Sequence, residues 1–202
     1  MTSSSFLDSL TRRLTVEEPT RLVPRASAGV AVIFHGPGDR EGVLLIRRAE
    51  REGDPWSGQV AFPGGMVSAA DGSFEETARR ETSEEVGVDL SSDAAAFLGY
   101  MGDFKARMRE VVVVPSVFKL AARTTVTLNK EVASYAWVPV RSLAKAEARS
   151  TYLLRRNGAE VAFPSLVHEG WVIWGLTERI LSAIIQNQEA GDDRVLGEIG
   201  RY

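Results

Sequence analysis

Apolar and polar residues along this chain fall into blocks that predict β-strands and helices in a mixed order. Apolar or alternating stretches typical of strands lie at residues 28–34, 43–47, 95–100, 111–120, 124–128, 135–138, 161–163 and 172–174. Helical spacing or capping residues predict helices near residues 6–14, 73–87, 140–146 and 176–186. The stretch 111–120 is almost continuously apolar, which is typical of a central strand.

The order of these elements predicts an α/β fold, an α/β/α sandwich with a mixed β-sheet between helices. We expect an N-terminal helical extension over residues 1–25, one domain over residues 26–188, and a polar C-terminal tail over residues 189–202. A chain of 202 residues is long enough for one well-packed core. The sequence contains no internal repeat that would indicate another architecture.

The predicted helix at residues 73–87 carries the most informative polar pattern. Ser73 and Glu76 form a capping-box signature at its start, and Gly87 suits its end. Positions i, i+3 and i+4 within it are the carboxylates Glu81, Glu84 and Glu85. At about 100° per residue these lie on one side of the helix, where like charges repel each other. A divalent cation such as Mg²⁺, which takes oxygen ligands together with substrate phosphates, would offset that repulsion.

A solvated charged helix face is the alternative interpretation of this acidic run. Apolar and small residues beside Glu81 and Glu85 indicate instead that these carboxylates point toward the side on which the helix packs. Arg80 is expected on the opposite side, toward solvent.

The segment before this helix, Phe62-Pro63-Gly64-Gly65, ends an apolar run with a sharp turn. Glycine allows positive φ and close backbone approach, and proline fixes the entry to the turn. An ordinary tight loop is the alternative for such a sequence alone. Followed by the acidic helix, it is interpreted as a glycine loop that brings backbone groups to a metal–phosphate group, with Phe62 and Gly64 as candidate substrate contacts.

Together, the glycine loop and the acidic helix resemble the Nudix box, a motif that binds divalent metal and hydrolyses diphosphates linked to another moiety. The residues at the motif positions are Gly65, Arg80, Glu81, Thr82, Glu84, Glu85, Gly87 and Val88. The resemblance implies a Nudix-like fold and the cofactor Mg²⁺ or Mn²⁺. It also implies that the metal ligands are Glu81, Glu84, Glu85 and the Gly65 carbonyl. Arg80 would orient the helix carboxylates by ion pairing.

The chain departs from the Nudix pattern at two places. The spacing before Arg80 is one residue longer, so the early glutamate position falls on Gly72. Asp71 or Glu75 would then have to supply that acid. Thr82 stands where an aliphatic residue is usual.

The longer spacing is shared with the coenzyme A pyrophosphatase branch of the family. Segments 44–48, 58–65, 129–132, 136–140 and 173–177 also resemble that branch, within a resemblance that runs from about residue 28 to about residue 186. The resemblance implies hydrolysis of coenzyme A or acyl-coenzyme A to 3′,5′-ADP and (acyl-)4′-phosphopantetheine.

Residues 54–57 are Asp-Pro-Trp-Ser, where that branch often has Arg and His. The alternative substrate is therefore another nucleoside diphosphate derivative: ADP-ribose, NADH or a dinucleotide polyphosphate. A non-catalytic Nudix-fold binding or regulatory module ranks lower, because it predicts a lost box carboxylate or an attached DNA-binding domain, and the sequence shows neither.

Glu131 is a further candidate for the reaction. It precedes a predicted strand and matches an acidic position that some Nudix relatives use for metal or base chemistry. The alternatives are a surface acid at Glu131 and a general base among the box carboxylates. The candidate catalytic group is thus Glu84, Glu85, Arg80 and Glu131.

Basic residues near the glycine loop are candidate phosphate contacts. Arg47 and Arg48 end a predicted strand and must point to opposite faces, so at most one faces the site. Arg107 is a candidate of equal rank in the loop 102–110, because such loops often cover a cleft. A charged strand end is the alternative interpretation of Arg47 and Arg48.

The composition of the chain limits the kinds of partner that we expect it to bind. A net charge of −3 gives no sign of a nucleic-acid-binding surface, and no apolar run approaches the roughly 20 residues of a membrane span. The absence of cysteine excludes thiol catalysis, and the first residues lack a signal-peptide plan. We expect a cytoplasmic protein without nucleic-acid or membrane partners, and the sequence leaves a homodimer open.

Overall fold

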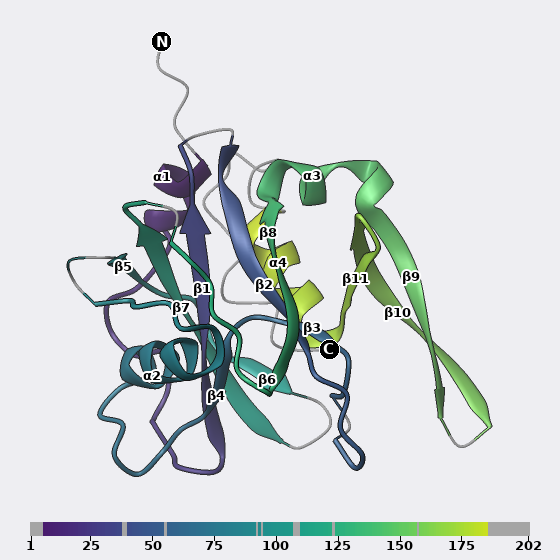
Figure 1. Ribbon diagram of the computed structural model, residues 1–202, viewed down its shortest axis with the longest axis horizontal. Helices are drawn as coiled ribbons and strands as arrows, with labels where there is room; N and C mark the ends of the chain where they lie inside the picture. The colour runs from purple at the N-terminus through teal and green to yellow at the C-terminus, as the bar shows by residue number, and fades with distance from the viewer. Residues whose placement is uncertain are drawn as a thin grey trace.

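The structure, a computed structural model, describes residues 6–37, 40–54, 56–91, 93, 95–106, 110–122, 124–156 and 158–185 (Figure 1). Its helices are α1 (Phe6–Thr11), α2 (Phe74–Val86), α3 (Val140–Ala144) and α4 (Gly175–Ile185), with a 3-10 turn at Ala146–Ala148. Its strands are β1 (Ser27–His35), β2 (Gly42–Arg48), β3 (Val60–Ala61), β4 (Gly64–Met66), β5 (Ala95–Tyr100), β6 (Phe104–Ala106), β7 (Val111–Leu120), β8 (Val132–Pro139), β9 (Arg149–Arg156), β10 (Ala159–His168) and β11 (Trp171–Trp174).

The main sheet is mixed and lies between helices, as the sequence predicted. β1 runs parallel to β7, whereas the β1–β2, β2–β8 and β5–β7 pairs are antiparallel. Val32 and Phe34 of β1 pack in the core that α1, α3 and α4 cover, and Ala31 and Ile33 pack on the α2 side. This alternation follows the two-residue period of a strand and produces the α/β/α layers visible in Figure 1.

A split in the main sheet positions the glycine loop. β1 pairs with β2 only through Phe34 and His35, and its first half pairs instead with β4. The far half of β2 pairs with β3. Residues 60–66 therefore fill the opening between the two diverging strands. Gly64 lies there at φ 154°, and a Cβ on it would come within 2.5 Å of the Gly29 carbonyl oxygen, so the close approach requires glycine.

A second sheet, in the order β11–β10–β9, is formed by the last third of the chain. The β9–β10 hairpin extends away from the main sheet in Figure 1. Leu166 and Ile173 anchor the base of this sheet in the core shared with α4. The sequence did not predict β9, because its Arg-Ser-Thr-Tyr-Leu-Leu-Arg-Arg sequence is polar at both ends.

Two predictions of secondary structure were wrong. Residues 124–128 form no strand, because the amides of Thr127 and Asn129 donate to the Val86 and Glu85 carbonyls at the end of α2. The loop predicted at 102–110 contains β6, which pairs with β7.

None of the helices in the described ranges is long and apolar enough to cross a membrane. The domain limits 1–25, 26–188 and 189–202 stay predictions, and residues 1–5 and the tail lie outside the described residues.

Candidate active site

Helix α2 begins and ends where its capping residues predict. The Ser73 hydroxyl accepts a hydrogen bond of 3.0 Å from the Glu76 amide, and Gly87 adopts φ 64° at the other end. The Glu76 carboxylate accepts from the Gly72 amide rather than from Ser73, so the capping box is only half formed. These caps set the register that places the acidic residues at the C-terminal half of the helix.

Glu85 is the most buried acid of this helix. It is 3% exposed, and its Oε2 accepts a 2.9 Å hydrogen bond from the Gly64 amide. The pKa of Glu85 is raised to about 7, chiefly by burial and also by the negative charges of Glu81 and Glu131, against the opposing effects of the Gly64 hydrogen bond and Arg48. A carboxylate desolvated in this way favours a bound cation.

Glu81 lies beside the glycine loop, one turn before Glu85. A Cβ on Gly65 would come within 2.5 Å of the Glu81 carboxylate, so only glycine leaves room for this acid. Burial raises the pKa of Glu81, whereas a 2.7 Å ion pair with Arg80 lowers it. Glu84, at 58% side-chain exposure, reaches into solvent with Arg80 3.6 Å away. The helix thus presents two desolvated acids and one exposed acid.

Arg80 is at the centre of an ion-pair network and not on the solvent side, which corrects the sequence prediction. Its guanidinium pairs with Asp71 through two hydrogen bonds of 3.0 and 2.9 Å, with Glu81, and with the Met66 carbonyl. The hydrogen bonds from Arg80 hold the pKa of Asp71 at about 2. Arg80 therefore ties the glycine loop to α2, as an orienting residue would.

Asp71, and not Glu75, is the acid that joins this network. Glu75 pairs with Arg79 at 2.6 Å, one turn along the helix and away from Arg80. The longer spacing before Arg80 is accommodated in the turn before α2, where the Asp71 carboxylate also accepts from the Ser68 amide at 2.8 Å.

Glu131 and Arg48 lie near the same acids. The negative charge of Glu131 and the positive charge of Arg48 both act on Glu85. Glu131 is 43% exposed and pairs with Arg51 at 3.1 Å, and Arg48 pairs with Asp54 at 2.8 Å. The sequence did not identify Asp54 as a partner of Arg48; the only local signal is an acid six residues after a base.

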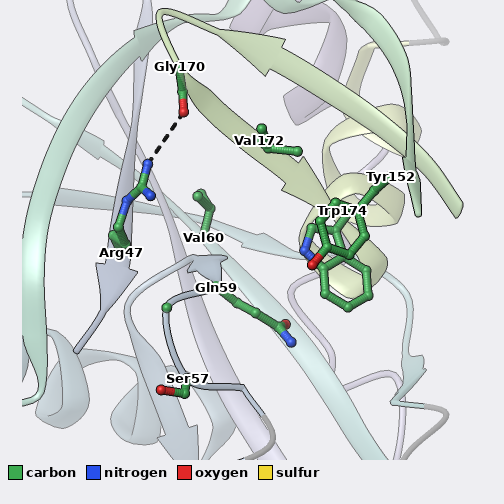
Figure 2. A pocket seen from close by; sticks show the side chains of 9 residues that line it. Arg47, Ser57, Gln59, Val60, Tyr152, Gly170, Val172 and Trp174 are labelled. Atoms are coloured by element: carbon green, nitrogen blue, oxygen red, sulfur yellow. Dashed lines mark hydrogen bonds between the residues drawn. The ribbon is translucent and has the colours of Figure 1, made fainter. Parts of the chain in front are cut away.

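Arg47 points to the other face of the sheet, as strand alternation predicts. It lines a pocket between residues 57–60 and the second sheet (Figure 2). The Phe62 side chain is 4% exposed and packs in the core, and its role as a substrate contact stays a prediction. Arg107 lies outside the described residues, so its predicted role stays a prediction.

The donor groups of the site fit a divalent cation. Within the described ranges, no three acidic, histidine or cysteine side chains converge to form a complete metal cage. Mg²⁺ does not require one, because it is usually held through one or two carboxylates together with water and substrate phosphates. Glu81 and Glu85 supply two such carboxylates, and the Gly64–Gly65 backbone lies against them.

Comparison with known proteins gives concordant results. A family model described as "NUDIX domain" matches residues 24–156. The chain is 34% identical over 153 residues to "Peroxisomal coenzyme A diphosphatase ndx-8" of Caenorhabditis elegans, which covers 74% of this chain and 64% of that protein. It is 28% identical over 177 residues to "Mitochondrial coenzyme A diphosphatase NUDT8" of Homo sapiens, covering 87% and 75%.

A solved structure shares the fold. A MutT/nudix family protein from Enterococcus faecalis aligns with a TM-score of 0.52 at 22% identity, over 85% of this chain and 64% of that one. The chain spans less than two thirds of the length of the C. elegans relative. The names of the two relatives place them in the peroxisome and the mitochondrion, so they do not support the cytoplasmic expectation.

Proposed function

Since the chain belongs to the Nudix hydrolase family, we propose that it hydrolyses the diphosphate of coenzyme A or an acyl-coenzyme A. The products would be 3′,5′-ADP and (acyl-)4′-phosphopantetheine. The observation that carries the reaction type is the pair of desolvated carboxylates, Glu81 and Glu85, held against the glycine loop. The substrate is supported by two relatives that are named coenzyme A diphosphatases.

The metal ligands proposed for Mg²⁺ or Mn²⁺ are Glu81, Glu84, Glu85 and the Gly65 carbonyl. A bound cation would neutralise the diphosphate charge and make a water more acidic. The protein's own part is to keep the acids converged, which Arg80 does by holding Glu81 and the turn at Asp71 together. Arg80 is therefore a positioning residue, and Gly64 keeps Glu85 in place through its amide.

Glu131 is the proposed general base. A base must reach the attacking water, and Glu131 is half exposed and close enough to Glu85 to influence its charge. Its carboxylate also pairs with Arg51 at 3.1 Å, and both side chains are 43% exposed. A box carboxylate is the alternative base.

Two alternatives follow from other observations. Asp54 pairs with Arg48 at a position where the coenzyme A branch often has a base, so less positive charge faces the substrate. That pairing favours ADP-ribose, NADH or a dinucleotide polyphosphate as the alternative substrate. A non-catalytic module ranks lower, because all three box carboxylates are present.

The test is an end-point assay of the purified protein with Mg²⁺ or Mn²⁺. Coenzyme A, acetyl-coenzyme A, ADP-ribose, NADH and diadenosine polyphosphates are offered side by side, and products are identified by mass. Release of 3′,5′-ADP and 4′-phosphopantetheine supports the proposal. AMP from ADP-ribose or NADH moves the substrate to another branch, and no turnover of any compound supports a binding module.

A further inference from the structure

A pocket of about 190 Å³ lies on the side of the main sheet away from α2. Its lining comes from two distant parts of the chain: Arg47, Ser57, Gln59 and Val60 on one side, and Tyr152, Gly170, Val172 and Trp174 on the other (Figure 2). Sites for whole drug-sized ligands measure roughly 300–1,000 Å³. This pocket is therefore sized for one portion of a substrate.

Arg47 is the charged side chain of the pocket lining, and its positive charge is not neutralised by its contacts within the described ranges. Its guanidinium donates to the Gly170 carbonyl at 3.5 Å and lies 5.1 Å from the Trp171 ring centroid. Arg48 and Arg51, by contrast, each pair with a carboxylate. Arg47 is thus oriented by neutral groups and retains the capacity to bind an anion, for which a guanidinium suits a phosphate.

An aromatic wall closes the other side of the pocket. The rings of Tyr152 and Trp174 stack with centroids 4.3 Å apart and an interplanar angle of 16°, and Phe163 packs against Trp174 at 5.6 Å. This stack fixes the orientation of the Trp174 indole, while Figure 2 shows the pair across the pocket from Arg47. A flat aromatic surface binds nucleobases with little dependence on their identity.

The pocket lies within reach of the diphosphate site. Val60 lines it, and Gly64, whose amide holds Glu85, follows four residues later. Four residues span at most about 14 Å even when fully extended. A substrate with its diphosphate at the glycine loop would have to pass one end around residues 60–64 to enter the pocket.

From these contacts we infer that the pocket binds a 3′-phosphorylated adenosine, with Arg47 on the 3′-phosphate and the base against the Tyr152–Trp174 wall. The inference rests on the proposed function, since coenzyme A is the substrate that carries such a group. It assigns Arg47 as the residue that distinguishes coenzyme A from 3′-dephospho-coenzyme A. A pantetheine or acyl arm in the same pocket would need no such cation.

Binding of products tests the pocket without turnover. Metal-free protein is titrated with 3′,5′-ADP and with AMP in a calorimeter. We expect 3′,5′-ADP to bind at least roughly tenfold more tightly than AMP, because its 3′-phosphate adds about one charge-assisted hydrogen bond. Arg47→Met should bind both nucleotides alike, and Arg47→Lys should retain part of the preference. Arg155→Met, which removes an 86% exposed arginine from the hairpin, is the charge-matched control and should retain all of it.

Steady-state kinetics then separates substrate binding in the pocket from the catalytic step. With Mg²⁺, Arg47→Met should raise KM for coenzyme A about tenfold and leave KM for 3′-dephospho-coenzyme A and both kcat values unchanged. The inference is overturned if Arg47→Met changes KM equally for coenzyme A and 3′-dephospho-coenzyme A. It is also overturned if the wild type binds 3′,5′-ADP and AMP with equal affinity. Preferential binding of 3′,5′-ADP without turnover of coenzyme A supports the pocket and overturns only the proposed reaction. Failure of the wild type to bind either nucleotide overturns the pocket.

Discussion

The Gly64 amide donates a 2.9 Å hydrogen bond to Oε2 of Glu85, which joins two residues 21 positions apart. Gly64 is pressed so closely against β1 that no side chain fits there. The bond therefore aims a buried carboxylate at a loop whose position is set by sheet pairing. The geometry of the acid and the pairing of β4 with β1 depend on each other.

Burial of Glu85 should make the metal-free protein less stable as the pH rises. The folded-state pKa is about 7, above the ordinary glutamate value of 4.5, so the folded chain retains a proton that the unfolded chain releases between these values. The stabilising effect is full below the unfolded pKa and is lost as the pH rises through the folded pKa. A shift of this size corresponds to roughly 3 kcal/mol. The melting temperature of metal-free protein should fall between about pH 5 and about pH 8, and Glu85→Gln should remove most of that fall.

The same variant should lose its response to metal. At about pH 8, Mg²⁺ or Mn²⁺ should raise the melting temperature of the wild type but not of Glu85→Gln, and turnover should fall at least about 10²-fold. Glu147→Gln, at an exposed position, removes one carboxylate elsewhere and should behave like the wild type. Metal-dependent turnover that survives in Glu85→Gln would show that the site is assigned wrongly.

Replacing Gly64 or Gly65 of the glycine loop with alanine should separate an effect on stability from an effect on catalysis. A Cβ at position 64 would meet the β1 backbone, so Gly64→Ala should destabilise the fold by at least about 2 kcal/mol. The nearest atoms to a Cβ at position 65 would be those of the Glu81 carboxylate, the end of a side chain that can rotate away. Gly65→Ala should therefore change stability by less than about 1 kcal/mol but lower kcat about 10²-fold through the displaced acid. Urea unfolding and initial rates measure the two effects, and a fully active Gly65→Ala would contradict the proposed proximity.

Asp71 should contribute to stability, and its contribution should disappear in acid. Its folded pKa of about 2 lies below the ordinary aspartate value of 3.8, so the stabilising effect is full above the unfolded pKa and is lost as the pH falls through the folded pKa. Asp71→Asn should cost about 2 kcal/mol at pH 7 in urea unfolding, and less as the pH approaches about 3. Glu75→Gln breaks the neighbouring pair with Arg79 and should cost only about 0.5 kcal/mol. Equal costs for the two variants would contradict a central role for the Asp71–Arg80 pair.

Glu131→Gln tests the proposed base. Loss of a general base should lower kcat by about 10² to 10⁴. Because the pair with Arg51 is half exposed, stability should change by less than about 1 kcal/mol. Arg51→Met breaks the same ion pair without removing the carboxylate and should retain kcat within about threefold if the base is Glu131 itself. Unchanged kcat in Glu131→Gln would assign the base to a carboxylate of the box.

Local sequence determined several features of this protein. Ser73 and Gly87 set the ends of α2, and spacing of three and four residues placed Glu81 and Glu85 together, because each helical turn repeats within that distance. Alternation along β2 separated Arg47 from Arg48 in the same way. The mixed sheet between helices also followed from the order of apolar blocks.

Only the tertiary structure decided how these local pieces meet. Three contacts could not be predicted from the periodicity of any one element. Arg80 pairs with Asp71 and not with Glu75, Arg48 pairs with Asp54, and residues 127–129 cap the end of α2. Tyr152 of β9 and Trp174 of β11 line one pocket with residues 57–60, which lie roughly a hundred residues earlier in the chain. Sequence periodicity specifies which face of an element is buried, whereas the pairing of strand edges specifies which faces come together, and that pairing is a property of the whole sheet.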